Sequence, residues 1–274
     1  MAMADSQPVL YSATDGVATI KLNRPAAHNA IDLATGHALL DACRKAAADD
    51  AVRVVIVAAD GPTFSAGGDF NWVLRWPHMP TAEVRAAAQL LADAVLMVCE
   101  LPKPTIARVQ GSVAGGGVGV MLACDYAVAA EGARIGLTSA RNGLLAGIAI
   151  PLLIQAVGAR RARQMLMHGG MYQAVEALQL GLVDRVAPPA QLDEEIARLA
   201  GELKLGAPSV QALVKRLVAE MEAKPNDDVM AQLIGHHVAL QCITPDATEG
   251  MSAFLQKRKP SWIAPHAVKN ESRG

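Results

Sequence analysis

Aromatic side chains are scarce in this chain, where Phe, Tyr and Trp together make up only 3% of the 274 residues. Because 52% of the residues are hydrophobic, the core must consist mainly of aliphatic side chains and alanine. The length is enough for one large domain, or for a domain with an appendage. The composition is that of a globular protein and not of a disordered one.

Further absences exclude whole classes of function. The four cysteines are scattered without the spacing of a metal site or a redox pair, which is typical of a reduced cytoplasmic protein. The seven histidines form no HExxH motif, so we expect no metal site. The formal net charge is −1, which gives no reason to expect a nucleic-acid partner.

Long apolar runs are also missing. The longest, 113–124 and 143–154, are too short to span a bilayer. The first ten residues, MAMADSQPVL, lack the apolar segment of a secretory signal. We therefore expect a cytoplasmic protein with no membrane partner.

The order of the predicted elements indicates an α/β fold. A turn at Asp15-Gly16 joins two strands, and buried strands then alternate with helices. The predicted strands are 9–12, 17–22, 52–59, 105–110 and 125–130, and the predicted helices are 33–48 (N-cap Asp32), 81–100 and 118–123. From Ala149 onward we expect helices only, one of them with Thr244 as N-cap and Pro245 as its first residue.

Two glycine-rich loops share one pattern, because each follows an apolar strand and precedes a helix. They are FSAGGDF at 64–70 and AGGGVGVML at 114–122. The start of a helix offers unpaired backbone N–H groups, and glycine lets a backbone come close to a ligand. Two such loops converging on one point would form a site for an oxyanion. The alternative is that the glycines only allow a helix to pack closely on a strand.

Other glycine motifs do not fit these loops. The dinucleotide motif GxGxxG would need glycine at 120 or 122, where the chain has Val120 and Leu122. No GK[ST] motif is present, which excludes the phosphate-binding loop of nucleoside triphosphatases. The nucleophile elbow GxSxG fails at Ser65, because residue 63 is threonine.

Blocks spread over nearly the whole chain resemble the crotonase superfamily, also called the enoyl-CoA hydratase/isomerase family. The blocks are IKLNRPAAHNAID, PTFSAGGDF, QGSVAGGGVGVMLACDYAVAAEGARIG, QAVEALQLGLVDRVAP and TEGMSAFLQKRKPSW. The resemblance implies a spiral of ββα units at 1–200 and a helical trimerisation region at 201–274. It also implies a homotrimer or a hexamer.

The resemblance further implies a substrate and a site. The substrate would be an acyl-CoA thioester, with no other cofactor, and its enolate oxygen would accept from the backbone N–H groups of Gly68 and Gly116. Each such donor is worth roughly 3 kcal/mol of barrier. The positions carried over for contacts with CoA or the acyl group are Ala66, Gly67, Asp69, Trp72, Val73 and Lys257.

Some of these positions have simpler alternatives. Asp69 would also suit the cap of the next helix, and Lys257 would also suit a solvated surface charge. Trp72 and Trp76 are one helical turn apart, so both can face one side, and one of them can equally be ordinary core.

The chain departs from the family at its acid–base positions. Two glutamates of typical hydratases correspond here to Gly119 and Ser139, and the aspartate of some relatives corresponds to Gly147. Hydration needs a general base and a general acid, which glycine cannot supply. Ser139 remains a candidate catalytic residue. Two substitutes, His78 and Glu83, follow the first loop, and Arg141 with Ser139 would suit a carboxylate or second carbonyl on the acyl group.

Three hypotheses follow. The first is an acyl-CoA enzyme of fatty acid metabolism, a lyase or isomerase, whose reaction is hydration or instead isomerisation, decarboxylation or C–C hydrolysis. The second is a catalytically inactive acyl-CoA-binding protein. The third is a serine hydrolase or peptidase on the same fold, which lacks a motif-placed Ser–His pair.

Overall fold

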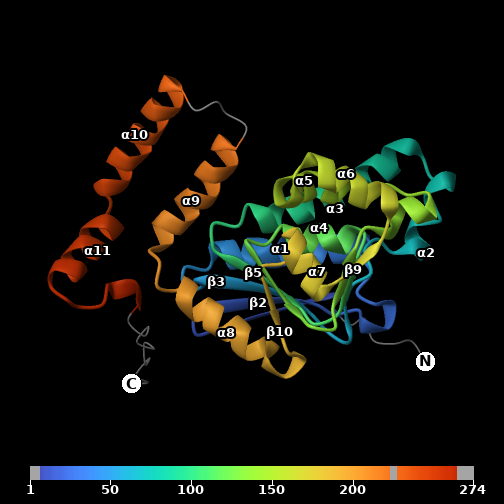
Figure 1. The fold of residues 1–274 in the computed structure, drawn as a ribbon, viewed down its shortest axis with the longest axis horizontal. Coiled ribbons are helices and arrows are strands. Elements are labelled where there is room, and N and C mark those ends of the chain that lie inside the picture. The colour runs from blue at the N-terminus through green and yellow to red at the C-terminus, as the bar shows by residue number, and fades with distance from the viewer. Residues whose placement is uncertain (1–6, 223–226, 264–274) are drawn as a thin grey trace, which may run out of the picture. The chain divides into compact units, whose positions relative to one another are not determined.

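The computed structural model describes residues 7–222 and 227–263. The chain divides into two compact units, Met1–Ala200 and Gly201–Gly274 (Figure 1). None of the helices within the described ranges is long and apolar enough to cross a membrane.

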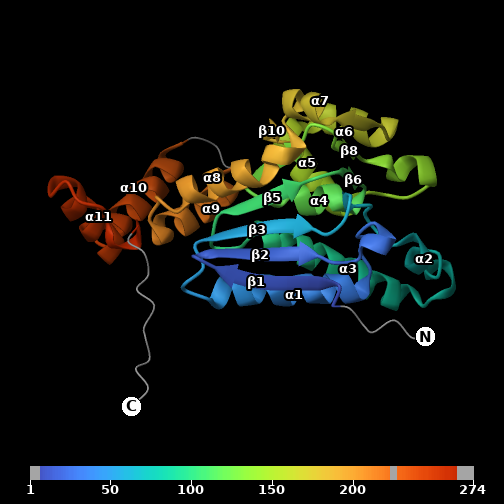
Figure 2. The same ribbon diagram turned by 90° about the horizontal axis from the view of Figure 1, so that it is seen from below.

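The first unit contains a six-stranded sheet in the order β1-β2-β3-β5-β7-β10. Strands β1 and β2 form a hairpin through Asp15 and Gly16, both with positive φ, as the Asp-Gly pair predicts. The remaining pairings are parallel, and Figure 2 shows β1, β2, β3 and β5 side by side. The strands are β1 (Val9–Thr14), β2 (Val17–Leu22), β3 (Val54–Ala59), β5 (Thr105–Val109), β7 (Tyr126–Ala130) and β10 (Arg185–Ala187).

A second sheet has the order β4-β6-β8-β9. Its strands are β4 (Thr63–Ser65), β6 (Ser112–Ala114), β8 (Arg134–Gly136) and β9 (Met171–Gln173). The chain passes repeatedly from a strand of the large sheet to a strand of the small one, as in β3–β4, β5–β6 and β7–β8, and then into a helix. This repetition is the spiral of ββα units, and the predicted α/β fold class is confirmed.

The helices of the first unit include α1 (Leu33–Ala48), α2 (Phe70–Val73), α3 (Thr81–Cys99), α4 (Gly116–Leu122), α5 (Ile150–Val157), α6 (Ala159–His168), α7 (Ala174–Leu180) and α8 (Leu192–Leu203), which ends just past Ala200. Asp32 caps α1 by accepting a hydrogen bond from the N–H of Thr35, as predicted. Helices α1 and α3 pack against each other.

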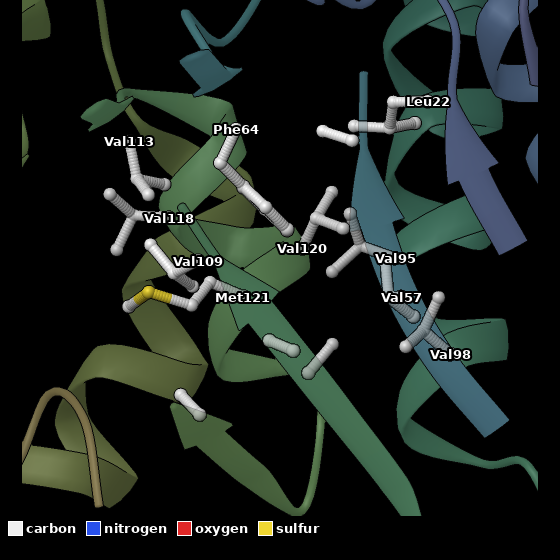
Figure 3. Packing of buried hydrophobic residues seen from close by; sticks show 14 of the residues in the cluster. Leu22, Val57, Phe64, Val95, Val98, Val109, Val113, Val118, Val120 and Met121 are labelled. Atoms are coloured by element: carbon white, nitrogen blue, oxygen red, sulfur yellow. The ribbon is translucent and has the colours of Figure 1, made fainter. Parts of the chain in front are cut away.

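The core of this unit is aliphatic, as the composition predicts. Figure 3 shows Phe64 packed among valines and Met121, between β3, β5, α3 and α4. Phe64 is fully buried and is the aromatic member of the core in the described part of the chain. It lies on β4 and is the first residue of the first glycine-rich segment, 64–70, so this segment starts from a firmly packed residue.

The second unit contains α9 (Pro208–Met221), α10 (Asp228–Cys242) and α11 (Pro245–Leu255). Thr244 caps α11 by accepting from the N–H of Ala247, and Pro245 is the first helical residue, as predicted. On α9, Val210, Val214 and Val218 recur every four residues and are exposed. They form an apolar stripe along the helix.

Three sequence-based expectations are wrong. Strands β9 and β10 follow residue 149, where helices only were expected. Each has three residues, which is too short for an alternating pattern to show in the sequence. The loop expected at 64–70 begins within β4, and α4 begins at Gly116 instead of Val118. Glycine disfavours a helix on propensity, so this start reflects tertiary packing.

An ion pair in the second unit predicts a pH dependence. Arg258 donates two hydrogen bonds to the carboxylate of Glu249 (2.6 and 2.8 Å), and the N–H of Ser261 donates a third (2.7 Å). These bonds, led by those of Arg258, lower the pKa of Glu249 from 4.5 to about 2. A carboxyl with a lowered pKa stabilises the fold above its unfolded pKa, and the contribution is lost as the pH falls through the folded pKa.

Above pH 4.5 we expect Glu249→Gln to lower the melting temperature only slightly, since the pair lies at the surface, with Arg258 exposed and Glu249 half-buried. The difference from the parent should close as the pH falls from 4.5 toward 2. Thermal unfolding monitored by circular dichroism measures this, with Glu131→Gln as a control at an exposed glutamate. A difference that does not change with pH would contradict the assignment.

Candidate functional site

The two glycine loops leave neighbouring parallel strands. Strands β4 and β6 pair in parallel, with Thr63 opposite Ser112 and Ser65 opposite Val113. The carboxyl ends of parallel strands lie at the same edge of a sheet. The loop after β4 and the loop after β6 therefore meet, as the shared strand–loop–helix pattern predicts.

The loops touch so closely that side chains are excluded. Gly67 has φ +88°, and a Cβ there would lie 2.7 Å from the carbonyl oxygen of Ala114 and 2.9 Å from the nitrogen of Gly116. A Cβ on Gly117 would lie 2.7 Å from the Cβ of Ser65. Glycine at both positions is therefore required by sterics. Close packing, the alternative explanation that the sequence left open, therefore accounts for the glycines at 67 and 117.

The backbone N–H of Gly68 points toward the second loop. Ile31 forms a parallel bridge with Gly68, in which the N–H of Ile31 donates to Gly67 (2.7 Å) and the N–H of Asp69 donates to Ile31 (3.0 Å). Successive peptide groups of an extended chain point to opposite sides, so the N–H of Gly68 faces away from Ile31. A Cβ on Gly116 would lie 3.8 Å from this nitrogen.

Gly116 is the first residue of α4, so its N–H has no partner within the helix. Neither this N–H nor that of Gly68 has a hydrogen-bond partner among the described residues. Both glycines are partly exposed. Two unpaired donors of this kind, side by side, can bind one anionic oxygen.

A turn at His28 and Asn29, within the block IKLNRPAAHNAID, holds the first loop in place. His28 and Asn29 have positive φ (51° and 52°), which reverses the chain so that it runs beside residues 65–69. The carbonyl of Asn29 accepts from the hydroxyl of Ser65 (2.8 Å), and that of His28 accepts from the N–H of Ala66 (2.9 Å). The buried amide of Asn29 also donates to the carbonyls of Asp60 and Thr63. Sequence reasoning did not single out this turn, although it lies in the first family-like block.

The predicted binding positions of the first loop occupy different environments. Ala66 is exposed, whereas Gly67 is buried between the loops. The carboxylate of Asp69 accepts from the N–H groups of Asn71 and Trp72, which confirms the capping alternative for this residue. Lys257 belongs to the second unit, where it follows α11 with an exposed side chain and φ 53°.

Helix α2 places apolar side chains next to the first loop. The Cγ2 atom of Val73 lies 3.8 Å from the position that a Cβ on Gly68 would take. The rings of Trp72 and Trp76 form a T-shaped contact with centroids 5.0 Å apart, which confirms that both face one side. Apolar surface thus lies beside the Gly68 donor.

The three expected carboxylate positions are near α4 and carry no acid. The hydroxyl oxygen of Ser139 lies 3.4 Å from the position of a Cβ on Gly115, which is the N-cap of α4. Gly119 follows one turn later and is buried, and a Cβ there would lie 3.5 Å from the Cα of Ala149. Gly147 begins the short 3₁₀ helix that contains Ala149 and packs on α4.

The other candidate acid–base residues, His78, Glu83 and Arg141, do not bind the glycine loops in the described part of the chain. His78 and Glu83 are exposed. The guanidinium of Arg141 donates to the carbonyl of His168 (3.1 Å). None of these three side chains makes a hydrogen bond or ion pair with the glycine loops within the described ranges.

The sequence model of the family described as "Enoyl-CoA hydratase/isomerase" matches residues 12–265, which include both glycine loops and the turn that holds the first. The chain belongs to the enoyl-CoA hydratase/isomerase family. Among solved structures, an enoyl-CoA hydratase from Mycobacterium smegmatis superimposes with a TM-score of 0.87 at 33% identity, covering 94% of this chain and all of that one (100%).

Relatives within this enoyl-CoA hydratase/isomerase family carry names for different reactions. A Thermus thermophilus protein with the provisional name enoyl-CoA hydratase is 35% identical over 89% of this chain and 96% of its own length. A trans-2-decenoyl-[acyl-carrier-protein] isomerase from Streptococcus mutans is 29% identical over 94% of this chain and 98% of its own. Family membership therefore leaves the reaction open.

Proposed function

We propose that the protein is an acyl-CoA enzyme that stabilises a thioester enolate between the backbone N–H groups of Gly68 and Gly116. The observation that carries this is the pair of unpaired N–H donors that lie side by side where two neighbouring strands end. A thioester oxygen that gains charge in the reaction would be stabilised there more strongly than in the ground state, which is what lowers a barrier. The substrate brings its own coenzyme A, and the proposal includes no metal and no further cofactor.

The reaction we propose is not hydration by two glutamates. Gly119 and Gly147 offer no proton-transferring group, and the hydroxyl of Ser139 is a poor base unless it is activated. Isomerisation, decarboxylation or C–C hydrolysis fits a site that stabilises an enolate without a pair of carboxylates. Ser139, close to Gly115, is the side chain we propose to contact the reacting acyl group.

For substrate binding we propose the positions that the family resemblance assigns. The acyl group would lie against Trp72 and Val73, since Val73 adjoins Gly68. Coenzyme A would contact the backbone of Ala66, Gly67 and Asp69, and Lys257 would reach a coenzyme A bound to a neighbouring subunit. Because the carboxylate of Asp69 is already bound as a cap, only its main chain is part of this proposal.

The second candidate is a catalytically inactive acyl-CoA-binding protein, which the three missing carboxylates favour. A panel of saturated, enoyl, 3-keto and carboxylated acyl-CoA thioesters, followed by mass spectrometry, distinguishes the two. Turnover of any member above the rate without protein supports the enzyme, and tight binding of acyl-CoA by calorimetry with no turnover supports the binding protein. Absence of both would overturn the proposal.

We also propose a homotrimer or a hexamer made of two trimers. The apolar stripe on α9 and the exposed Val238, Phe254 and Leu255 of α10 and α11 need a partner surface. Multi-angle light scattering at micromolar concentration should give three or six times the mass of the 28.6 kDa chain. A stable monomer would contradict this prediction.

A further inference from the structure

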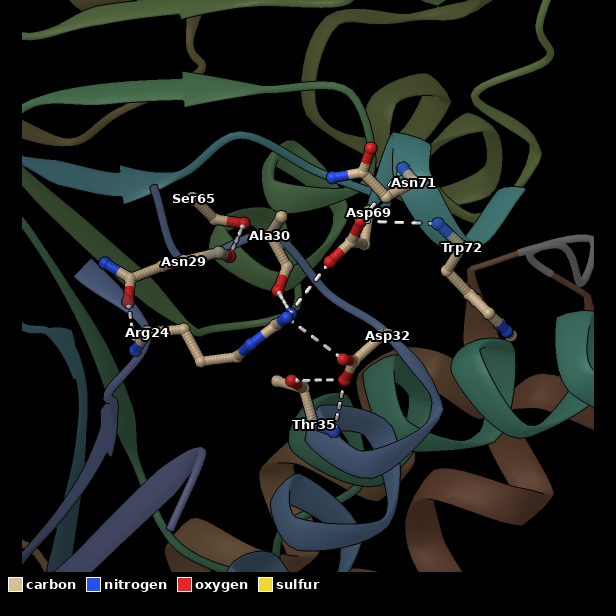
Figure 4. Close-up of polar contacts among 9 residues, drawn as sticks. All are labelled: Arg24, Asn29, Ala30, Asp32, Thr35, Ser65, Asp69, Asn71 and Trp72. Carbon is tan, nitrogen blue, oxygen red and sulfur yellow. Dashed lines mark hydrogen bonds and ion pairs between the residues drawn. The ribbon is translucent and has the colours of Figure 1, made fainter. Parts of the chain in front are cut away.

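The guanidinium of Arg24 is bound on three sides. It donates hydrogen bonds to a carboxylate oxygen of Asp69 (3.0 Å) and to the carbonyl of Ala30, and it forms an ion pair with Asp32 (3.1 Å), as Figure 4 shows. The side chains of Arg24, Asp32 and Asp69 are only 25%, 24% and 12% exposed. Hydrogen bonds between charged groups shielded from water are stronger than those on an open surface.

Two of these partners lie directly beside the Gly68 donor. Asp69 follows Gly68 in the chain, and Ala30 precedes Ile31, which pairs with Gly68 on the side away from the second loop. The peptide group that carries the Gly68 N–H is thus held by the next residue of the chain, Asp69, and by the paired segment that contains Ala30 and Ile31. Arg24 connects these two supports through one planar cation.

The main chain of Arg24 is held as well. Its N–H donates to the side-chain oxygen of Asn29 (2.8 Å), and its carbonyl accepts from the N–H of Asn29 (2.9 Å). Asn29 in turn fixes Asp60, Thr63 and Ser65 through the hydrogen bonds described above. The guanidinium therefore projects from a fixed backbone, and a change in its side chain is transmitted to Asp69 and Ala30.

We infer that Arg24 is a positioning residue that fixes the orientation of the Gly68 N–H through Asp69 and Ala30. This inference rests on the proposed function, because it assigns a role to that donor. Arginine suits the role, since its fork of N–H groups binds two carboxylates and a carbonyl at once, which a lysine ammonium cannot do with the same geometry. Arg24 itself does not contact the substrate.

Loss of the guanidinium would leave the buried carboxylate of Asp69 without its counter-charge, and the loop would shift to reach water. A displacement of the order of 1 Å in a catalytic group can cost about a hundredfold in rate. Binding of free coenzyme A, which has no thioester oxygen, should change less than binding of the thioester. The expected result is therefore a loss specific to the thioester carbonyl.

The test uses the full-length protein and a saturated acyl-CoA with an isotope label in its thioester carbonyl. Its acyl group is the one that binds most tightly among short, medium and long ones. Isotope-edited infrared spectroscopy reports the stretching frequency of this carbonyl, which two N–H donors lower. The variants are Arg24→Met, Arg24→Lys and Asp69→Asn. Asparagine at 69 keeps the cap of α2 but removes the charge that Arg24 binds. Arg44→Met is the matched control at an exposed ion pair with Asp41.

In the parent and in Arg44→Met, we expect a frequency well below that of the free thioester. In Arg24→Met and Asp69→Asn it should return toward the free value, and the preference for acyl-CoA over coenzyme A should fall about three- to tenfold. The carbonyl frequency in Arg24→Lys should lie between that of the parent and that of Arg24→Met. For any thioester that the parent turns over, kcat should fall about a hundredfold in Arg24→Met.

The outcomes separate the two proposals. A parent with no frequency shift would overturn the oxyanion-binding function, and this inference with it. A shifted parent together with folded Arg24→Met and Asp69→Asn variants that keep the parental frequency would overturn the positioning role alone. If Arg24→Met does not fold, Arg24→Lys and Asp69→Asn decide by the same readout.

Discussion

Replacing Gly68 by proline should lower acyl-CoA turnover about a hundredfold or more while the protein stays folded. Proline has no backbone N–H, so the variant deletes one of the two proposed donors and nothing else in that peptide's hydrogen bonding. The carbonyl of Gly67 and the N–H of Asp69, which bind Ile31, remain available. The measurement is the rate constant for whichever thioester the screen identifies, with circular dichroism to confirm the fold.

The structure provides a matched control for this variant. A Cβ on Gly68 would meet only the Cγ2 of Val73, at 3.8 Å, which is ordinary van der Waals contact. Gly68→Ala keeps the N–H, so its turnover should stay within a few-fold of the parent. Equal losses in Gly68→Pro and Gly68→Ala would mean that steric fit, not the donor, matters here. Unchanged turnover in folded Gly68→Pro would remove this N–H from the mechanism.

Installing the missing acids as Gly119→Glu with Ser139→Glu should raise hydration of crotonyl-CoA by about a hundredfold or more, since a placed acid or base contributes about 10²–10⁴-fold. The structure favours the placement, because Gly119 lies one turn after Gly115 on α4 and Ser139 adjoins Gly115. Two carboxylates this close would raise the pKa of one of them, which a paired acid and base require.

This double variant should be less stable than the parent. A Cβ at 119 has room, but the rest of the side chain must displace Ile148, whose Cγ2 would lie 3.6 Å from that Cβ. We therefore expect lower stability, since a charge enters an apolar contact. Loss of enoyl absorbance measures hydration, and Gly119→Gln with Ser139→Gln controls for size without supplying a base. A folded double-glutamate variant that binds coenzyme A and hydrates no faster than the glutamine control would contradict the residue matching.

The fold could be predicted from the sequence where local signals are strong. Asp15-Gly16, Asp32 and Thr244-Pro245 each encode their turn or cap in a few neighbouring residues, and the structure has each as predicted. The small second sheet could not be predicted, because its three-residue strands depend on pairings between distant segments. The glycine start of α4 was missed for the same reason, since its cause is the close approach of Ser65 and not helix propensity.

The site was predictable only in part. The position of the two glycine loops at the ends of strands was visible in the sequence, and their meeting follows from strand adjacency. The role of Arg24 was not visible, because Asp69 is 45 residues away along the chain and only the fold brings the two together. The same holds for Asn29 and Thr63, which are 34 residues apart.

The direct contact between the loops at Gly67 and Gly116 has an evolutionary consequence. Both proposed donors are main-chain groups, and the contact between their loops is made by backbone atoms, with side chains such as Arg24 supporting it from outside. The positions that would carry acids, 119, 139 and 147, lie outside that contact. Point mutations there can change which proton moves, or whether one moves at all, while the proposed binding of the thioester oxygen by the two main-chain donors is left unchanged. A chain built in this way can exchange one reaction for another without first passing through a form that no longer holds its substrate.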